Sequence, residues 1–513
     1  MKQRNQTSIQ IALLLAFILS SGIYACHHSD PMQKTIISGV VTNFQDPYDL
    51  PALELINYMP FISEWNIHTC FIESDGYFRF EFEQLYPQGI MIKFKEILSV
   101  YAHPGDSIYV TIDARMLSDS SKRMGFENNY IRIVCPNQRF QDEYQSFTQS
   151  YYGKFQTMDD RLALREAQKN LDHAGYSDYI KDKSAKRQAF LEKYFKTNNS
   201  SSEFQEWADN WIYLHELDDL IRYSWLHPRF AELDRNTFRL PEAYYDFLKD
   251  ERHNDEILLA SQMYRSFLQE LYMHLSREFN QTELHSQFDS LCKAGNETDA
   301  YRLRLNYYIE NSDGFEQEFQ VSRFYSRLIF WKMLDEFDAL YDPSLVGRED
   351  YNQILANEYS RMIELIEEPV FAKDLFLHDS NNSELDLIFA TLPDKFPDKV
   401  MYIDFWAPWC GPCLAEMPHS KELQEEMKGK DVVFIFLSNR CSEKSWKATI
   451  AQKQLFGEHF LLSDKEYSML AAKFNIGGIP RYMIIDKKGM IINDNAPRPS
   501  DESLVGLLKT LYH

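Results

Sequence analysis

The chain has 513 residues, a formal net charge of −23, seven cysteines and 15% aromatic residues. This length is enough for two to four domains, and the aromatic content can supply large cores. Because the surface must be strongly acidic, the composition argues against binding to nucleic acid and against electrostatic docking on anionic lipid.

The N-terminus has the pattern of an export signal. A basic start precedes an apolar run over residues 9–19, which is too short to span a membrane comfortably. Residues 23–26 resemble a bacterial lipobox, which implies removal of residues 1–25 and attachment of lipid to Cys26. Ordinary signal cleavage that leaves Cys26 as a free thiol is the alternative. Either way we expect an exported protein, in which residues 26–33 form a short tether.

Residues 34–115 carry the patterns of β-strands. Phenylalanine alternates with charged residues over 77–83, which is typical of a strand with one buried face. A second strand over 69–73 and a turn at 74–76 predict a β-hairpin with it. Further strands are expected at residues 89–95, 98–102 and 107–113. We therefore expect a domain of β structure over 34–115, for which a spacer or packing role is favoured.

Residues 116–372 are predicted to form a central all-α region. Apolar side chains recur at helical spacing over 204–217 and 264–275, and aromatic stripes of this kind usually form a core. His215 and the following glutamate begin like the zinc-protease motif H-E-x-x-H. Asp219 stands where that motif needs its second histidine, so the motif is absent.

Residues 401–418, MYIDFWAPWCGPCLAEMP, carry the strongest chemical signal. A strand that is apolar on both faces leads to a turn with Cys410 and Cys413, and then to a helix. Unpaired N–H groups and the helix dipole stabilise a thiolate at such a position, and the thiolate is the nucleophilic form of cysteine. A zinc site would need a second pair of ligands, but only Cys441 and His459 follow. The pair is therefore predicted to be redox-active.

This segment resembles the thioredoxin family, and in particular its TlpA/ResA branch. The resemblance rests on Asp404 in the strand, on Trp409 before the first cysteine and on the Glu-Met-Pro run at 416–418. Residues 477–480, Gly-Gly-Ile-Pro, precede a second apolar strand as the family's cis-proline segment does. The resemblance covers about the last quarter of the chain and implies an α/β thioredoxin fold over 373–513.

Within that fold, the resemblance implies specific roles in thiol–disulfide exchange. Cys410 attacks the substrate disulfide, Cys413 resolves the mixed disulfide, Asp404 accepts the proton of Cys413, and Glu416 tunes the pair. Substrate contacts are implied for Trp409, Gly411, Pro412, Ile479 and Pro480, with the Pro480 peptide bond cis. An ordinary buried aspartate and a solvated helix glutamate are the alternatives for the two acids. The remainder of the domain is expected to begin with an edge strand near 371–377 and a helix near Ser383.

The Gly-Pro dipeptide between the cysteines matches the reducing members of the family, so we expect an envelope protein-disulfide reductase. No cofactor beyond the Cys410–Cys413 disulfide and no metal are expected. The resemblance implies a membrane electron donor of the CcdA/DsbD kind and disulfide-containing envelope substrates, including apocytochrome c. Residues 104–113 resemble part of the small β-sandwich that precedes thioredoxin domains in some Gram-negative lipoproteins, which implies a β-sandwich domain over 34–115. A lipid anchor on Cys26 would then hold the redox domain at an envelope membrane, in the periplasm.

Two other functions stay open. A peroxiredoxin-like thiol peroxidase of the AhpC/TSA kind shares the fold, but it typically has threonine three residues before its cysteine, where this chain has Ala407. A binding or scaffold lipoprotein with accessory thiols is the other. The remaining cysteines, Cys70, Cys135, Cys292 and Cys441, could pair in an oxidising compartment. Cys441 is either a third redox thiol or, as we favour, a bystander.

Overall fold

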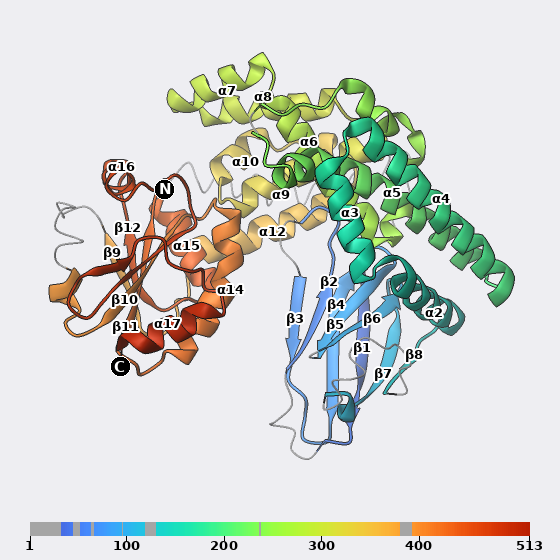
Figure 1. Cartoon of the computed structure of the whole chain (residues 1–513), viewed down its shortest axis with the longest axis horizontal. Coiled ribbons are helices and arrows are strands. Elements are labelled where there is room, and N and C mark those ends of the chain that lie inside the picture. The colour runs from blue at the N-terminus through green and yellow to red at the C-terminus, as the bar shows by residue number, and fades with distance from the viewer. Residues whose placement is uncertain are drawn as a thin grey trace, which may run out of the picture.

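A computed structural model of the chain describes residues 32–44, 52–62, 66–94, 96–117, 130–234, 237–379 and 392–512. The expected export signal, Cys26 and the helix expected near Ser383 lie outside these residues. Figure 1 shows three parts, with β-strands at the N-terminal end, a helical region, and a second region of strands and helices at the C-terminal end.

The N-terminal part forms two four-stranded sheets. The first has the order β4 (Tyr77–Gln84), β1 (Gln33–Thr42), β7 (Ser107–Asp113), β8 (Ile131–Val134). The second has the order β3 (Asn66–Cys70), β2 (Leu53–Asn57), β5 (Gln88–Phe94), β6 (Glu96–Ala102). One core joins them, in which Phe80 of the first sheet and Ile92 of the second are both buried. The prediction of β structure is confirmed, although β8 extends it past residue 115 into the range expected to be helical.

The predicted hairpin is wrong. Residues 74–76 do form a tight turn, because the N–H of Gly76 donates to the carbonyl of Glu73. However, β4 pairs antiparallel with β1, and β3 pairs with β2 in the other sheet. The chain therefore crosses between the two sheets at this turn. This arrangement buries the alternating phenylalanines of β4 as well as a hairpin would, because their side chains face the core shared by the two sheets.

The helical region contains α2 (Gln138–Phe155), α3 (Met158–Asn170), α4 (His173–Asn198), α5 (Ser202–Phe230), α6 (Gln262–Phe279), α7 (Glu283–Lys293), α8 (Glu297–Glu310), α9 (Gly314–Phe330), α10 (Leu334–Leu340), α11 (Pro343–Val346) and α12 (Glu349–Glu367). Short 3-10 helices are η2 (Ala114–Leu117), η4 (Glu242–Lys249), η5 (Glu251–His253) and η6 (Glu256–Ala260). The two predicted stripes lie on α5 and α6 and are buried, as expected. No helix among the described residues has the length and apolar character needed to cross a membrane.

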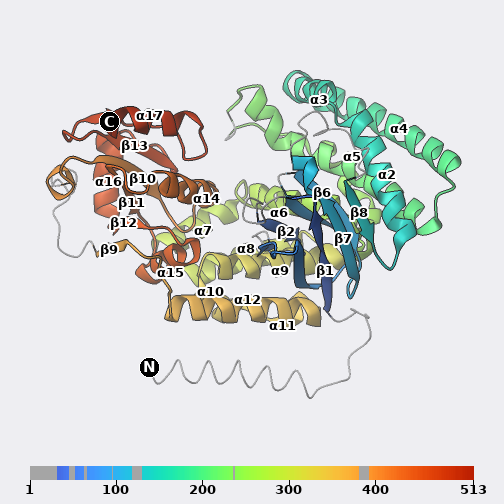
Figure 2. The same cartoon turned by 90° about the horizontal axis from the view of Figure 1, so that it is seen from below.

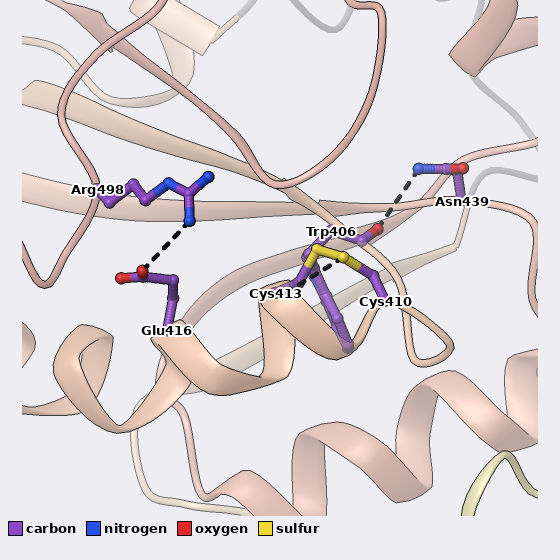
Figure 3. The surroundings of a disulfide bond; sticks show 6 residues. All are labelled: Trp406, Cys410, Cys413, Glu416, Asn439 and Arg498. Carbon is purple, nitrogen blue, oxygen red and sulfur yellow. Dashed lines mark hydrogen bonds and ion pairs between the residues drawn. A yellow bond between two sulfur atoms is a disulfide. The ribbon is translucent and has the colours of Figure 1, made fainter. Parts of the chain in front are cut away.

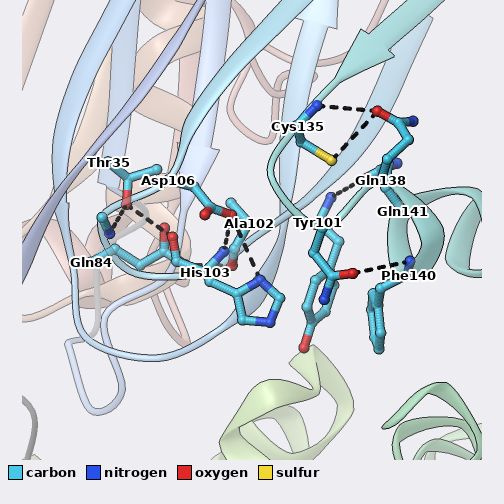
Figure 4. A network of polar contacts seen from close by, with 12 residues as sticks. Thr35, Gln84, Tyr101, Ala102, His103, Asp106, Cys135, Gln138, Phe140 and Gln141 are labelled. Atoms are coloured by element: carbon cyan, nitrogen blue, oxygen red, sulfur yellow. Dashed lines mark hydrogen bonds and ion pairs between the residues drawn. The ribbon is translucent and has the colours of Figure 1, made fainter. Parts of the chain in front are cut away.

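The helical region packs directly on the β-sheets. The side chain of Gln141 in α2 accepts a hydrogen bond from the N–H of Tyr101 at 2.8 Å, and the Tyr101 ring lies 4.6 Å from that of Phe140 (Figure 4). At the other end of this junction the carbonyl of Phe61 accepts from the guanidinium of Arg323 in α9. The first two parts of the chain thus share buried polar contacts.

The C-terminal part has one six-stranded sheet in the order β14 (Ile491–Asn493), β13 (Arg481–Ile485), β10 (Val400–Trp406), β11 (Val432–Ser438), β12 (Gly457–Leu461), β9 (Leu375–Asp379). Its helices are α14 (Gly411–Glu426), α15 (Glu443–Lys453), α16 (Asp464–Lys473) and α17 (Ser503–Tyr512). Strands β10, β11, β12 and β9 run parallel, β13 is antiparallel to β10, and β14 is antiparallel to β13. This order confirms the predicted thioredoxin topology, including the edge strand before the central strand. In Figures 1 and 2 the helical region lies between this domain and the sheets, and α12 packs on α15.

Candidate active site

Cys410 and Cys413 lie where the central strand β10 passes into α14. Cys410 is the N-cap of α14, and its Sγ accepts a hydrogen bond from the N–H of Cys413 at 3.2 Å. The two cysteines form a disulfide with a Cα–Cα distance of 5.2 Å (Figure 3). The predicted pair is therefore brought together at a helix N-terminus, in its oxidised form.

The disulfide is almost covered. Cys410 has 4% of its surface exposed and Cys413 1%, so the two cysteines differ little in exposure. Trp409, by contrast, is 44% exposed, and its indole N–H donates to the carbonyl of Arg440 at 2.9 Å. Gly411 and Pro412 are exposed in the first turn of α14. Access to the sulfurs is therefore limited, and Trp409 is the exposed aromatic side chain next to them.

Asp404 lies on β10 two residues before the fully buried Trp406. Because side chains alternate along a strand, Asp404 faces the same side as Tyr402 and Trp406, which pack with both cysteines in one cluster. Its Oδ1 has no hydrogen-bond partner among the described residues. Burial raises the pKa of Asp404 well above its ordinary value, and the nearby charge of Glu416 raises it further. This environment therefore favours the protonated form of the carboxyl group.

Glu416 is buried in α14, one turn after Cys413. Its carboxylate accepts hydrogen bonds from the N–H of Ser500 at 3.1 Å and the hydroxyl of Ser500 at 3.0 Å. The guanidinium of Arg498 lies 3.7 Å away (Figure 3). The alternative of a solvated helix glutamate is thereby excluded. Ser500 and Arg498 were missed from the sequence, because no motif connects them with Glu416, which lies 84 residues before Ser500.

The Ile479–Pro480 peptide bond is cis, as the resemblance implied. The next residue, Arg481, pairs with Phe405 of β10, so Pro480 comes to the end of β10 from which the Cys410 loop departs. Ile479 packs against the clusters on both faces of the sheet. This segment therefore belongs to the same edge of the sheet as the disulfide.

Asn439, which the sequence did not single out, fixes the ends of the two central strands. It is buried at the end of β11, and its amide donates to the carbonyl of Trp406 at 3.4 Å (Figure 3). Two residues further on, burial raises the pKa of Cys441 to about 11, so its thiol stays protonated at neutral pH. This favours the bystander interpretation of Cys441.

The other four cysteines of the described residues form no second disulfide. Cys70, Cys135, Cys292 and Cys441 are all unpaired in the structure. Among the described residues, no three His, Cys, Asp or Glu side chains are grouped closely enough to hold a metal ion. Among the described residues, the disulfide at the start of α14 is thus the candidate redox group.

Comparisons with known proteins point the same way. The Redoxin family model matches residues 377–507. The chain is 32% identical over 148 residues to thioredoxin-like protein YneN of Bacillus subtilis, which covers 29% of this chain and 81% of that protein. It is 28% identical over 113 residues, 22% of this chain, to thiol-disulfide oxidoreductase ResA of Bacillus thuringiensis, and spans 64% of that relative.

A solved thioredoxin domain of a thiol-disulfide oxidoreductase from Bacteroides vulgatus is 22% identical, with coverage of 23% of this chain and 84% of that one and a TM-score of 0.22. The sequence relatives, the strand order, the cysteine pair at the start of α14 and the cis-proline segment agree with one another. The chain therefore belongs, through its C-terminal domain, to the thioredoxin-fold family of TlpA/ResA-like thiol-disulfide oxidoreductases.

Proposed function

We propose that this chain is a thiol–disulfide oxidoreductase of the cell envelope that reduces disulfides in partner proteins. The observation that carries the proposal is the hydrogen bond from the N–H of Cys413 to the Sγ of Cys410 at the N-terminus of α14. In the reduced protein the same N–H group and the positive end of the helix dipole would stabilise the Cys410 thiolate. That thiolate is the nucleophile of the reaction.

The reaction has two steps. The Cys410 thiolate attacks one sulfur of the partner's disulfide, forming a mixed disulfide and releasing the other sulfur as a thiolate. The Cys413 thiolate then attacks Cys410 Sγ, which forms the Cys410–Cys413 bond and releases the partner's second thiolate. Two electrons pass from the chain to the partner. The disulfide form in Figure 3 is the oxidised product, which a reductant must return to the dithiol.

Asp404 and Glu416 serve the second step. Cys413 has to lose its proton before it attacks, and a buried carboxyl group with a raised pKa is a suitable acceptor. In the oxidised form that proton would reside on Asp404, in agreement with the raised pKa of this group. Glu416, held by Ser500 and Arg498, contributes to that raised pKa and so acts as a positioning and tuning residue.

The partners and the location are also part of the proposal. Trp409, Gly411, Pro412, Ile479 and Pro480 would contact the substrate, by resemblance to the family. A membrane protein of the CcdA/DsbD kind would supply electrons, a lipid on Cys26 would anchor the chain, and envelope proteins such as apocytochrome c would be substrates. The Gly-Pro dipeptide between the cysteines supports the reducing direction.

The redox potential tests this function. The purified full-length protein is equilibrated in glutathione buffers, its thiols are trapped, and the oxidised fraction of Cys410–Cys413 is read by mass spectrometry. We expect a potential near that of thioredoxin, about −270 mV. A value near that of the oxidant DsbA, about −120 mV, would contradict the reducing direction. The absence of any reversible couple would contradict an oxidoreductase function altogether.

A further inference from the structure

A cleft separates the helical region from the active-site edge of the C-terminal domain. Its volume is about 1090 Å³. One wall is formed by Glu297, Tyr301 and residues 331–336, and the other by Pro408, Trp409 and residues of the segments 440–445 and 461–464. Figures 1 and 2 both show α10 on the side of the helical region that faces the C-terminal domain. Because Trp409 immediately precedes Cys410, this cleft adjoins the approach to the disulfide.

Both walls of the cleft are held in place. The helical region contacts the C-terminal domain through α12 and α15, and the side chain of Gln454 donates to the carbonyl of Val370 at 2.7 Å. On one wall the Arg327 guanidinium lies 4.2 Å from the Trp331 ring centre. On the other wall the indole N–H of Trp409 donates a hydrogen bond to the carbonyl of Arg440. Small-molecule pockets usually measure about 300–1,000 Å³, so this space also suits a short stretch of extended polypeptide.

The charge of the cleft is predominantly negative. Its lining includes five acidic side chains, Glu297, Asp335, Glu336, Glu443 and Asp464, and two basic ones, Lys332 and Arg440. On the helical wall, burial raises the pKa of Glu336, and the neighbouring charges of Glu297 and Asp335 raise it further. Glu297 and Asp335 therefore both repel a negative charge on Glu336, and none of the three has an ion pair within 4 Å among the described residues. A cationic group that enters the cleft would relieve this repulsion.

We propose that this cleft binds a basic, extended segment of the disulfide-bearing partner beside Trp409, and that the helical region thereby selects substrates by charge. The inference rests on the proposed function, since it assigns a substrate class to the same redox site. The carboxylates of Glu297, Asp335 and Glu336 recognise lysine or arginine side chains that flank the partner's disulfide. The exchange of electrons follows the two steps given above.

The first test compares two synthetic peptides of equal length, each closed by one disulfide and flanked by either lysines or glutamates. The reduced full-length protein is mixed with each peptide, and the second-order rate of its oxidation is followed by tryptophan fluorescence. We expect the lysine peptide to react at least about tenfold faster at low ionic strength, since steering raises association rates by roughly 10–10³. The ratio should fall as salt is added. Equal rates at low salt would overturn the proposal.

A pair of matched variants locates the effect. The triple change Glu297→Gln, Asp335→Asn, Glu336→Gln removes three negative charges from the helical wall of the cleft. The control Asp178→Asn, Glu192→Gln, Glu206→Gln removes three exposed charges from α4 and α5, outside the cleft. We expect the lysine preference to fall to about threefold or less in the first variant and to stay unchanged in the control. An equal fall in both variants would mean that only the overall charge of the chain matters. That result would overturn the proposal that the cleft binds the basic segment.

A small neutral disulfide separates this inference from the proposed function. We expect 2-hydroxyethyl disulfide to oxidise the unmodified protein and both triple variants at the same rate, because it carries no charge. If 2-hydroxyethyl disulfide reacts normally while the preference for the lysine peptide is absent, only the proposal of substrate selection by the cleft is overturned. If it does not oxidise Cys410 and Cys413 at all, the proposed function fails and this inference fails with it.

Discussion

The C-terminal domain and the helical region both bury charged or chargeable side chains, but in contrasting ways. Beneath the disulfide, Asp404 has a carboxyl oxygen without a partner among the described residues, and burial raises its pKa. In the helical region, the buried Arg187 lies 3.0 Å from Asp219, which also pairs with Lys183 at 3.3 Å. A carboxyl group can lose its charge by binding a proton, whereas a guanidinium stays charged and must be compensated. The first arrangement suits proton exchange, and the second holds helices together.

Two further arginines extend this contrast to the N-terminal sheets. Burial lowers the pKa of Arg265 to about 10, so it is still charged at neutral pH. It lies 3.3 Å from the side-chain oxygen of Gln88 and over the ring of Tyr58, while Arg323 donates to the carbonyl of Phe61. These guanidinium groups thus contact neutral oxygens and an aromatic face. The helical region is fixed to the sheets by groups that do not titrate near neutral pH.

The largest effect is expected on the redox side of this contrast, from Cys413→Ser. Without the resolving thiol the mixed disulfide on Cys410 persists, so turnover in insulin reduction should fall by at least about 10³-fold. The mixed disulfide itself should accumulate and be visible on a non-reducing gel. Cys70→Ser, a change at an unpaired cysteine in β3, is the control and should keep full turnover. Turnover by Cys413→Ser within tenfold of the unmodified protein would contradict the mechanism.

On the structural side, Asp219→Asn should destabilise the chain without changing its redox potential. The change leaves the buried Arg187 without its counter-ion, which costs about 3–5 kcal/mol where one partner of a buried pair is removed. Urea unfolding followed by circular dichroism measures the loss. Asp209→Asn, which breaks the exposed pair with Arg252, should cost less than about 1 kcal/mol. Similar costs for both changes would remove the distinction between the two pairs.

Asp404→Asn should affect both the rate and the pH dependence. The loss of a proton acceptor is expected to slow exchange at pH 7 by about 10²-fold. Because the pKa of Asp404 is raised on folding, the folded chain binds more protons than the unfolded one above about pH 4, so stability falls as pH rises through this range. The asparagine variant lacks this fall. Unfolding measured at pH 4, 6 and 8 should therefore show the variant gaining stability relative to the unmodified protein as pH rises.

The smallest effect is expected from Ser500→Ala. It removes the hydroxyl that donates to Glu416 but leaves the backbone N–H bond, at a cost of about 1–2 kcal/mol in the free energy of unfolding. The redox potential should shift together with this loss, because the charge of Glu416 raises the pKa of Asp404. Ser503→Ala is the matched control, since the Ser503 hydroxyl donates to the exposed Asp501 instead of to Glu416. If the Ser500→Ala and Ser503→Ala variants have the same redox potential, Glu416 has no tuning role.

The parts of the fold that could be predicted are those fixed by neighbours in sequence. In the C-terminal sheet β10, β11 and β12 are each followed by a helix, so β10, α14 and β11 could be predicted from periodicity and from the cysteine motif. The hairpin at residues 74–76 was not, because a tight turn limits direction locally but does not decide with which strand β4 pairs. The bonds of Glu416 to Ser500 and the acidic wall at Glu297 arise from tertiary packing, which no spacing rule encodes.

The near-complete cover of Cys410 has a kinetic consequence. A sulfur with 4% of its residue's surface exposed admits one partner molecule at a time. In the proposed reaction, the protein that delivers electrons and the protein that receives them would therefore use the same opening in turn. We accordingly expect steady-state turnover to follow a ping-pong scheme, in which each partner in excess inhibits the other's access.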